Sequence, residues 1–125
     1  MGWLQSLLGG GPTVHPTTIR TLDGLKALVS DFDGPVLVDV WSPSCGPCVK
    51  LGPVMTELAT KHAGRAKVAE IDVSAAEPAL LRELNVMATP TIIIYEGGEE
   101  FGRVKGFRPP SWFHEMLDAE FPQGA

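Results

Sequence analysis

Two cysteines separated by two residues are the most reactive feature of this sequence. The segment Cys45-Gly46-Pro47-Cys48 contains both cysteines of the chain. A small disulfide ring can therefore open and close here without the domain unfolding. Such a pair alone fits half of a zinc site, a permanent disulfide or a redox couple. No second C-x-x-C and no H-x-x-x-H follows, which disfavours zinc, so we predict a redox pair with no metal and no other cofactor.

The position of the pair along the chain favours a reactive thiol. Residues 36–41 form an apolar run interrupted only by Asp39, which predicts a strand buried on both faces. After the cysteines, apolar side chains recur at helical spacing at Leu51, Val54, Met55 and Leu58. The cysteines then lie at the start of a helix, where backbone N–H groups and the helix dipole favour a thiolate. Pro47 lacks an N–H group that would have no partner in the first turn.

Two carboxylates are candidates for proton chemistry beside the cysteines. Asp39 stands in an apolar strand, and lone buried acids are rare without a task; a hydrogen-bonded structural carboxylate is the alternative. Glu70 lies in a second predicted strand, residues 66–73. If Glu70 points at Asp39, the two like charges raise one pKa. If it points to solvent, burial alone raises the pKa of Asp39.

The elements that position these residues alternate along the chain. Strands are predicted at residues 17–20, 36–41, 66–73, 91–95 and 100–105, the last two joined by a turn at Gly97-Gly98. Helices are predicted from residue 22 to the stop at Gly34-Pro35, after the cysteines, from Pro78, and from Pro109-Pro110. This order predicts an α/β fold with a final antiparallel hairpin.

Composition excludes several classes of protein. The chain has 125 residues, of which 44% are hydrophobic and 20% charged, which suits one folded domain and excludes a disordered chain. The net charge of −5 with no basic run argues against nucleic-acid binding. No apolar run reaches about 18 residues, so no membrane-spanning helix is expected. We expect no signal peptide, because the N-terminus lacks Lys and Arg, and a cytoplasmic location.

The first 16 residues are expected to be a tail outside the domain. Within it, Gly9, Gly10, Gly11 and Pro12 separate the first eight residues from the rest, and one helical face of those eight would carry Trp3, Leu4, Leu7 and Leu8. The segment either packs on its own domain or frays, or it serves as a docking or membrane-surface anchor. The absence of a basic residue weakens the membrane alternative.

A set of ordered motifs is shared with a known family. It comprises residues 38–48 (V-D-V-W-S-P-S-C-G-P-C), Pro53, Ala88-Thr89-Pro90-Thr91, Gly97-Gly98 and Gly106. Together they resemble the thioredoxin family over residues 17–121, leaving 122–125 as a C-terminal tail. The resemblance implies the α/β thioredoxin fold, with a central mixed five-stranded sheet in the order 1-3-2-4-5 and four flanking helices.

The resemblance also implies roles for individual residues. Cys45 matches the exposed attacking cysteine and Cys48 the buried resolving one. Asp39 matches a buried acid that relays a proton to or from the second sulfur. Glu70 is the candidate for modulating the pKa of Asp39 through its charge, and this role does not come from the resemblance. Pro90 matches a cis-proline beside the disulfide that presents backbone to an extended substrate. The other substrate-binding candidates are Trp41, Gly46, Pro47, Thr89 and Gly106.

Three positions depart from the family pattern. Ser44 stands where the family commonly has tryptophan, Val49 where lysine is frequent, and Glu70 where many bacterial members carry a buried lysine. Met87 and Phe107 are either ordinary apolar residues or part of the rim around Pro90. His15, His62 and His114 belong to no motif and are expected at surface or capping positions.

The resemblance implies a thiol–disulfide oxidoreductase that reduces protein disulfides through a mixed disulfide. Its partners would be disulfide-containing client proteins and a flavoprotein reductase, with no nucleic acid and no membrane, and the protein would be a monomer. The alternative is a client-binding module with secondary redox activity. Ser44 and the apolar N-terminus favour that alternative, whereas the presence of Cys45, Cys48 and Asp39 argues against it.

Overall fold

The computed structural model describes residues 12–123, so the expectations for the first 11 residues lie outside the described part of the chain. Strands and helices alternate in the order expected. The elements are β1 Thr17–Thr18, α2 Leu22–Asp31, β2 Val36–Trp41, α3 Gly46–Lys61, β3 Lys67–Asp72, α4 Pro78–Leu84, β4 Thr91–Glu96, β5 Glu99–Lys105 and α5 Pro110–Glu120.

The five strands form one mixed sheet in the order β1-β3-β2-β4-β5, which confirms the predicted fold class and strand order. The central strand β2 pairs in parallel with β3 and antiparallel with β4. The last strand, β5, forms a hairpin with β4 and pairs antiparallel with it. Because β4 runs antiparallel to β2 and β5 runs antiparallel to β4, the end of β2, the start of β4 and the end of β5 meet at one end of the sheet.

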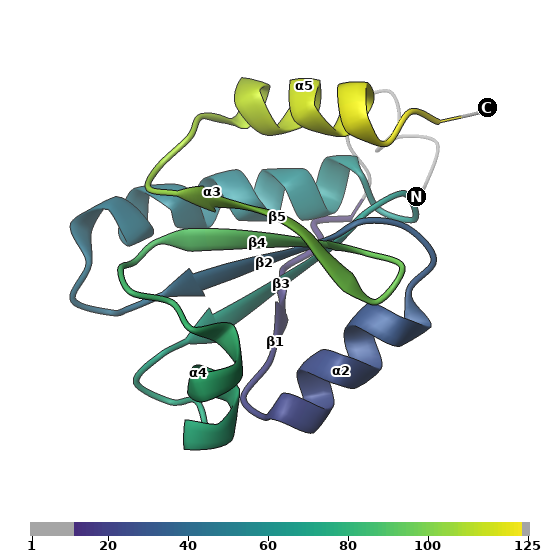
Figure 1. Ribbon diagram of the computed structural model, residues 1–125. Coiled ribbons are helices and arrows are strands. Elements are labelled where there is room, and N and C mark those ends of the chain that lie inside the picture. Colours follow the sequence, from purple (N-terminus) through teal and green to yellow (C-terminus); the bar gives the residue numbers. More distant parts are fainter. Residues whose placement is uncertain (1–11, 124–125) are drawn as a thin grey trace.

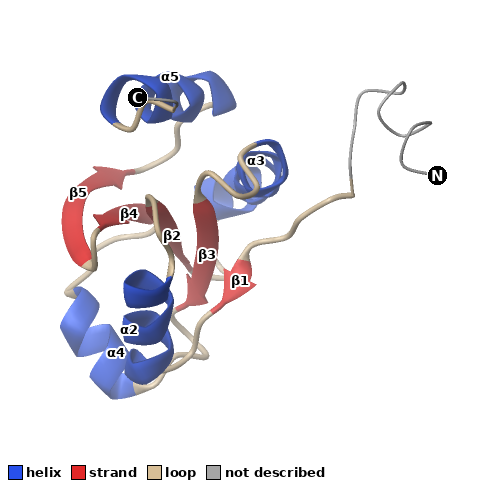
Figure 2. Ribbon diagram, turned by 90° about the vertical axis from the view of Figure 1, so that its right-hand side faces the viewer, coloured by secondary structure: helices blue, strands red, loops and turns tan. Residues whose placement is uncertain are grey.

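Each face of the sheet is covered by two helices (Figures 1 and 2). On one face, α3 and α5 bury a cluster that includes Leu37, Leu51, Ile92 and Phe113. On the other, α2 and α4 bury a cluster that includes Val38, Val40, Leu80 and Ile93. Alternation along β2 therefore explains its continuous apolar run, since both of its faces need apolar side chains.

The N-terminal strand is shorter than predicted, which is a correction to its boundary. The prediction was residues 17–20, whereas β1 contains only Thr17 and Thr18. One further bond to the sheet follows, from Ile19 N–H to the carbonyl of Glu70 at 2.9 Å. Thr21 then caps α2 by accepting a hydrogen bond from Gly24 N–H, so the chain must leave the sheet to start the helix.

The helix at residues 78–84 starts at the proline, as predicted. Pro78 is its first residue, where the missing N–H costs nothing. Glu77 precedes it, and its carboxylate accepts a hydrogen bond from Leu22 N–H at 3.0 Å. Glu77 therefore caps the first turn of α2 rather than that of its own helix.

Candidate active site

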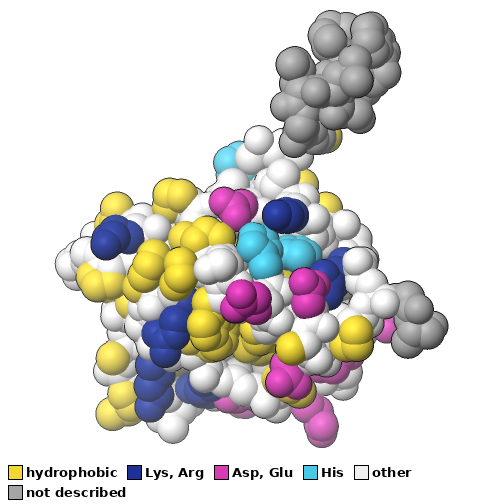
Figure 3. All heavy atoms as spheres, turned by 90° about the horizontal axis from the view of Figure 1, so that it is seen from above, with side chains coloured by type: hydrophobic (Ala, Val, Ile, Leu, Met, Phe, Trp, Pro, Cys, Tyr) yellow, Lys and Arg dark blue, Asp and Glu magenta, His cyan; other side chains and the backbone are white. Residues whose placement is uncertain are grey.

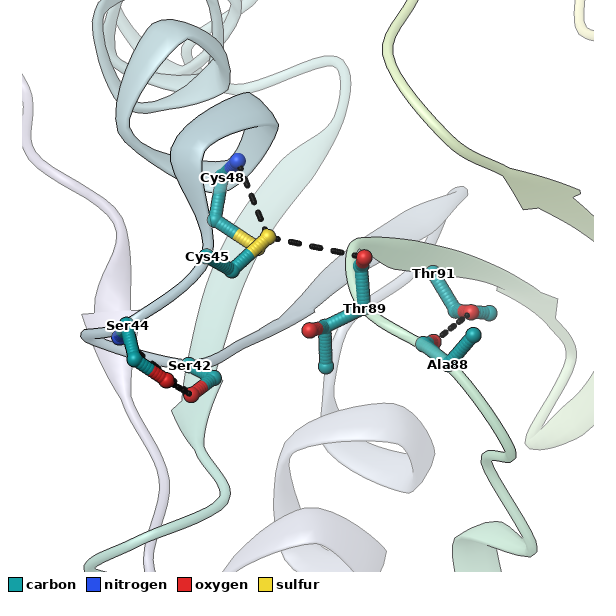
Figure 4. Close-up of a disulfide and its surroundings, with 7 residues drawn as sticks. All are labelled: Ser42, Ser44, Cys45, Cys48, Ala88, Thr89 and Thr91. Atoms are coloured by element: carbon teal, nitrogen blue, oxygen red, sulfur yellow. Dashed lines mark hydrogen bonds between the residues drawn. A yellow bond between two sulfur atoms is a disulfide. The ribbon is translucent and has the colours of Figure 1, made fainter.

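The disulfide sits where β2 ends and α3 begins. Cys45 and Cys48 are joined in the structure, which therefore holds the oxidised form (Figure 4). Cys45 is the N-cap of α3, and its Sγ accepts a hydrogen bond from Cys48 N–H at 3.2 Å. This N–H group and the helix dipole favour negative charge on Cys45 once the disulfide opens.

The two sulfurs differ in exposure. Cys45 is half buried, whereas Cys48 is only 4% exposed. Gly46 and Pro47 lie exposed between them, with Pro47 at the second position of the helix. A macromolecular disulfide can therefore reach Cys45 but not Cys48, as the sequence led us to expect.

The loop before β4 faces the disulfide. The Thr89–Pro90 peptide bond is cis, which confirms that prediction. The carbonyl oxygen of Thr89 lies 3.5 Å from Cys45 Sγ (Figure 4). Thr91 Oγ1 donates a hydrogen bond to the carbonyl of Ala88 at 2.7 Å and so closes the turn around the proline. Backbone beside the sulfur is thus held in a fixed position.

Gly106 connects this loop to the last strand. Its N–H group donates to the carbonyl oxygen of Pro90 at 2.8 Å, and its φ angle is +84°. A residue with a side chain is strained at that angle, so glycine suits the turn that follows β5. Cys45, Thr89, Pro90 and Gly106 are therefore brought to one edge of the sheet from three parts of the chain.

Asp39 is buried beneath this edge. It is 4% exposed, and its Oδ1 atom is buried without a hydrogen-bond partner among the described residues. On the neighbouring strand it is in register with Glu70. Burial is the larger cause, and the charge of Glu70 the smaller, of a pKa raised from 3.8 to about 7. This is the direction expected from the sequence.

The Glu70 side chain points neither directly at Asp39 nor fully into solvent, the two orientations that the sequence left open. It is half buried, and its carboxylate accepts a hydrogen bond from Thr18 Oγ1 at 3.1 Å, so it turns towards the edge strand β1. It nevertheless acts on Asp39 through its charge. Trp41 and Asp72 line a small surface pocket together with Glu70. The indole Nε1 of Trp41 is buried without a partner in the described part of the chain.

The rim beside the cis-proline is open and partly apolar. Met87 is 90% exposed, so it belongs to the rim rather than to the core. It lines a surface pocket of about 400 Å³ together with Ser42, Val86 and Thr89. Ser44 is exposed, and its hydroxyl lies 3.2 Å from that of Ser42. No large side chain fills the position before Cys45.

The structure also joins residues that the sequence left unassigned. His62 Nε2 lies 2.8 Å from His114 Nδ1, and His114 Nε2 lies 3.1 Å from a Glu57 oxygen. His62 is buried rather than at the surface, and it is the C-cap of α3, so the capping alternative is the one that holds for it. Because 52 residues separate the two histidines, no local spacing in the sequence could indicate this contact.

Comparison with known proteins assigns this site to a family. A thioredoxin family model matches residues 17–119. Thioredoxin from Staphylococcus epidermidis is 37% identical over 99 residues, covering 75% of this chain and 94% of that protein. Thioredoxin from Staphylococcus aureus is 36% identical over the same length and coverage. The chain belongs to the thioredoxin family.

The fold of a solved family member agrees with this assignment. A single-residue variant of thioredoxin from Halobacterium salinarum superposes with a TM-score of 0.75 at 29% identity. The match covers 89% of this chain and 95% of that one. Together with the Cys45–Cys48 disulfide, membership of the thioredoxin family makes this protein a thiol–disulfide oxidoreductase, with disulfide-containing substrates and a reductase as partners.

Two further findings concern other kinds of site. Among residues 12–123, no group of three or more His, Cys, Asp or Glu side chains is arranged to hold a metal ion. No helix in that range has the length and apolar character needed to cross a bilayer.

Proposed function

We propose that this thioredoxin-family protein reduces disulfides of client proteins in two successive exchanges. The Cys45 thiolate attacks one client sulfur, the client S–S bond breaks, and a mixed disulfide forms while the other client sulfur leaves as a thiolate. Cys48, once deprotonated, attacks Cys45 Sγ and releases the second client sulfur. Two electrons pass to the client, and the protein ends in the disulfide form.

The observation that carries this proposal is the unequal access to the two sulfurs. Cys45 is half exposed and faces the Thr89 carbonyl at 3.5 Å, whereas Cys48 is 4% exposed behind it. An attacker must meet a large substrate, but a resolver needs to reach only Cys45 Sγ. The hydrogen bond from Cys48 N–H to Cys45 Sγ supports Cys45 as the thiolate.

Asp39 is proposed as the proton acceptor for Cys48. It lies on the face of β2 that also carries Leu37, and Leu37 packs against α3, the helix of Cys48. A pKa of about 7 allows the carboxyl group to take a proton and lose it again near neutral pH. Glu70 is proposed to tune this pKa through its charge.

The client backbone is proposed to bind beside the cis-proline. Thr89 and Pro90 present fixed backbone next to Cys45, and Gly106 leaves space for close approach. Gly46, Pro47 and Trp41 are proposed to complete the contact surface. The pocket lined by Met87 offers room for an apolar client side chain.

The remaining proposals rest on family membership. A flavoprotein reductase is proposed to return the Cys45–Cys48 disulfide to the dithiol. The protein is proposed to act in the cytoplasm as a monomer, with residues 17–121 as its domain and residues 1–16 and 122–125 as tails.

Reduction of insulin by dithiothreitol, followed as turbidity, tests the proposed reaction. The wild-type protein should accelerate the reaction, and Cys45→Ser should abolish the acceleration. The control is Ser44→Ala, which changes an exposed side chain directly before Cys45 and leaves both sulfurs in place. This variant should retain activity. A wild-type protein that binds client chains without accelerating reduction would support the binding-module alternative instead.

A further inference from the structure

The loop between β5 and α5 borders the active site and carries the basic residue Arg108. The N–H group of Gly106 in this loop donates a hydrogen bond to the carbonyl oxygen of Pro90. Lys105 precedes Gly106, and Phe107 and Arg108 follow it. Lys50, two residues after Cys48 on α3, faces the same loop, because its ammonium group lies 5.4 Å from the centre of the Phe107 ring. Two cations, Lys50 and Arg108, therefore lie on the α3 and α5 side of the disulfide.

Aromatic and apolar groups lie among these cations. The Arg108 guanidinium lies 5.8 Å from the centre of the Trp112 ring. Val49, the neighbour of Lys50 in the sequence, is 66% exposed. We call this surface the basic shelf, and it consists of Val49, Lys50, Phe107, Arg108 and Trp112.

The position of Arg108 is fixed by the backbone of its own loop. Its Nη1 donates to the carbonyl oxygen of Phe107 at 2.9 Å and to that of Lys105 at 3.3 Å. An arginine held in this way loses less conformational freedom when it pairs with a carboxylate. The shelf is thus organised before any partner arrives.

The cations of the basic shelf have no acidic partner in the described part of the chain. The salt bridges found there involve Arg65, Arg103 and His114. The first turn of α3 and the first turn of α5 contain no acidic residue. Figure 3 shows Lys and Arg side chains among hydrophobic ones towards its left-hand side, the side where α3 begins, while Asp and Glu lie nearer the centre and right.

The opposite side of the active-site edge carries negative charge. Glu70 and Asp72 are half buried in β3 and line a pocket next to Trp41. Since β3 and β5 lie on opposite sides of β2 in the sheet, the disulfide is flanked by carboxylates on one side and by the basic shelf on the other. In a chain with a net charge of −5, this local excess of cations is distinctive.

We propose that the basic shelf selects client disulfides flanked by acidic residues interspersed with an apolar one. Client carboxylates would pair with Lys50 and Arg108, while the apolar side chain would rest on Phe107 and Val49. Charges at the rim of an interface act mainly on the rate and orientation of encounter. This inference rests on the proposed function, because it concerns which disulfides Cys45 reaches.

The test compares two synthetic peptides that contain the same disulfide loop. One loop is flanked by Glu-Leu-Glu and the other by Lys-Leu-Lys, and the second-order rate constant for reduction by the reduced protein is measured for each. At low salt we expect the acidic peptide to react about fivefold faster, the size expected for a few exposed ion pairs. The preference should shrink towards unity in about 0.5 M NaCl, because salt screens exposed charges.

Two variants with the same net charge distinguish the effect of the basic shelf on this preference from the effect of the overall charge. The combined change Lys50→Gln and Arg108→Gln should abolish the preference. The combined change Lys26→Gln and Lys67→Gln lowers the net charge equally at remote positions and should retain the preference. Equal rates for the two peptides with the wild-type protein, or a preference that survives in the shelf variant, would overturn the inference and leave the proposed function intact. Reduction of neither peptide would overturn both.

Discussion

At the scale of single residues, the buried carboxyl group of Asp39 links the active site to stability. Its pKa is about 7 in the folded protein, against 3.8 for a free aspartate. Between these two values the folded form retains a proton that the unfolded form has lost. The contribution of Asp39 to stability is therefore fully present below about pH 4 and is lost as the pH rises through about 7.

Replacing Asp39 with asparagine should stabilise the oxidised protein at high pH. The ionised form loses at most about 4 kcal/mol, and an incompletely bonded amide recovers only part of that. We expect Asp39→Asn to raise the free energy of unfolding by about 2 kcal/mol at pH 8 and to lose this advantage at pH 4. Urea unfolding at both pH values measures the effect. An equal gain at pH 4 and pH 8 would contradict a raised pKa.

A second variant separates the two causes of the shift. Glu70→Gln keeps the buried carboxyl group but removes the neighbouring charge, so the pH-dependent loss of stability should move to lower pH without disappearing. Glu115→Gln, an exposed change on α5, is the control and should leave the transition in place.

In turnover assays, Asp39→Asn should slow resolution of the mixed disulfide by about a hundredfold, the lower end of the rate loss expected when a positioned base is removed.

At the scale of elements, polar contacts fasten α5 to the end of α3. His62 contacts His114, and the Arg65 guanidinium donates to the carbonyls of Leu117 and Phe121. Arg65 also pairs with Asp118 at 3.0 Å. Burial is the largest cause of a lowered pKa for His62, followed by the charges of His114 and Arg65. The neutral form of His62 is therefore the one that fits this contact.

Acid should weaken the contact between α3 and α5. Because the pKa of His62 is lowered in the folded protein, its contribution to stability is present above pH 6.5 and is lost as the pH falls below it. We expect His62→Gln to cost about 1 kcal/mol at pH 7.5, through the lost hydrogen bonds, and much less at pH 5. The difference between wild-type and variant unfolding free energies, plotted against pH, measures this. A difference independent of pH would contradict the assignment, and His15→Gln serves as the exposed control.

Glu77 links the start of α4 to the start of α2. Its carboxylate accepts a hydrogen bond from Leu22 N–H at the start of α2, although Glu77 itself precedes α4. Glu77→Ala should therefore lower the free energy of unfolding by about 1 kcal/mol, as expected for a lost helix cap. Glu83→Ala, an exposed change within α4, should be close to neutral. Equal effects of the two substitutions would argue against a capping role.

At the scale of the whole molecule, the order of elements was predictable because each is encoded locally. The apolar run of β2, the proline at the start of α4 and the glycine pair between β4 and β5 each act within a few residues. The placement of Cys45 at a helix start follows in the same way. The position of Thr89 beside Cys45 depended on a resemblance, since chain-local rules do not bring residues 44 positions apart together.

Other features depended on long-range packing and were not predictable. The contact of His62 with His114 joins two helices, and the basic shelf combines α3 with the loop after β5. The Glu70 orientation was left open by the sequence because the hydroxyl that attracts it belongs to β1. Each of these depends on which elements become neighbours, and periodicity along one segment carries no information about that.

Trapping of the mixed disulfide tests the central claim most directly. The Cys48→Ser variant can attack a client disulfide through Cys45 but cannot resolve the product. After incubation with an oxidised client protein, intact-mass spectrometry should show one client chain bound covalently to this variant and released by dithiothreitol, with tandem spectra placing the bond on Cys45. No adduct with Cys48→Ser, or an equal adduct formed by Cys45→Ser through Cys48, would contradict the assignment of attacker and resolver.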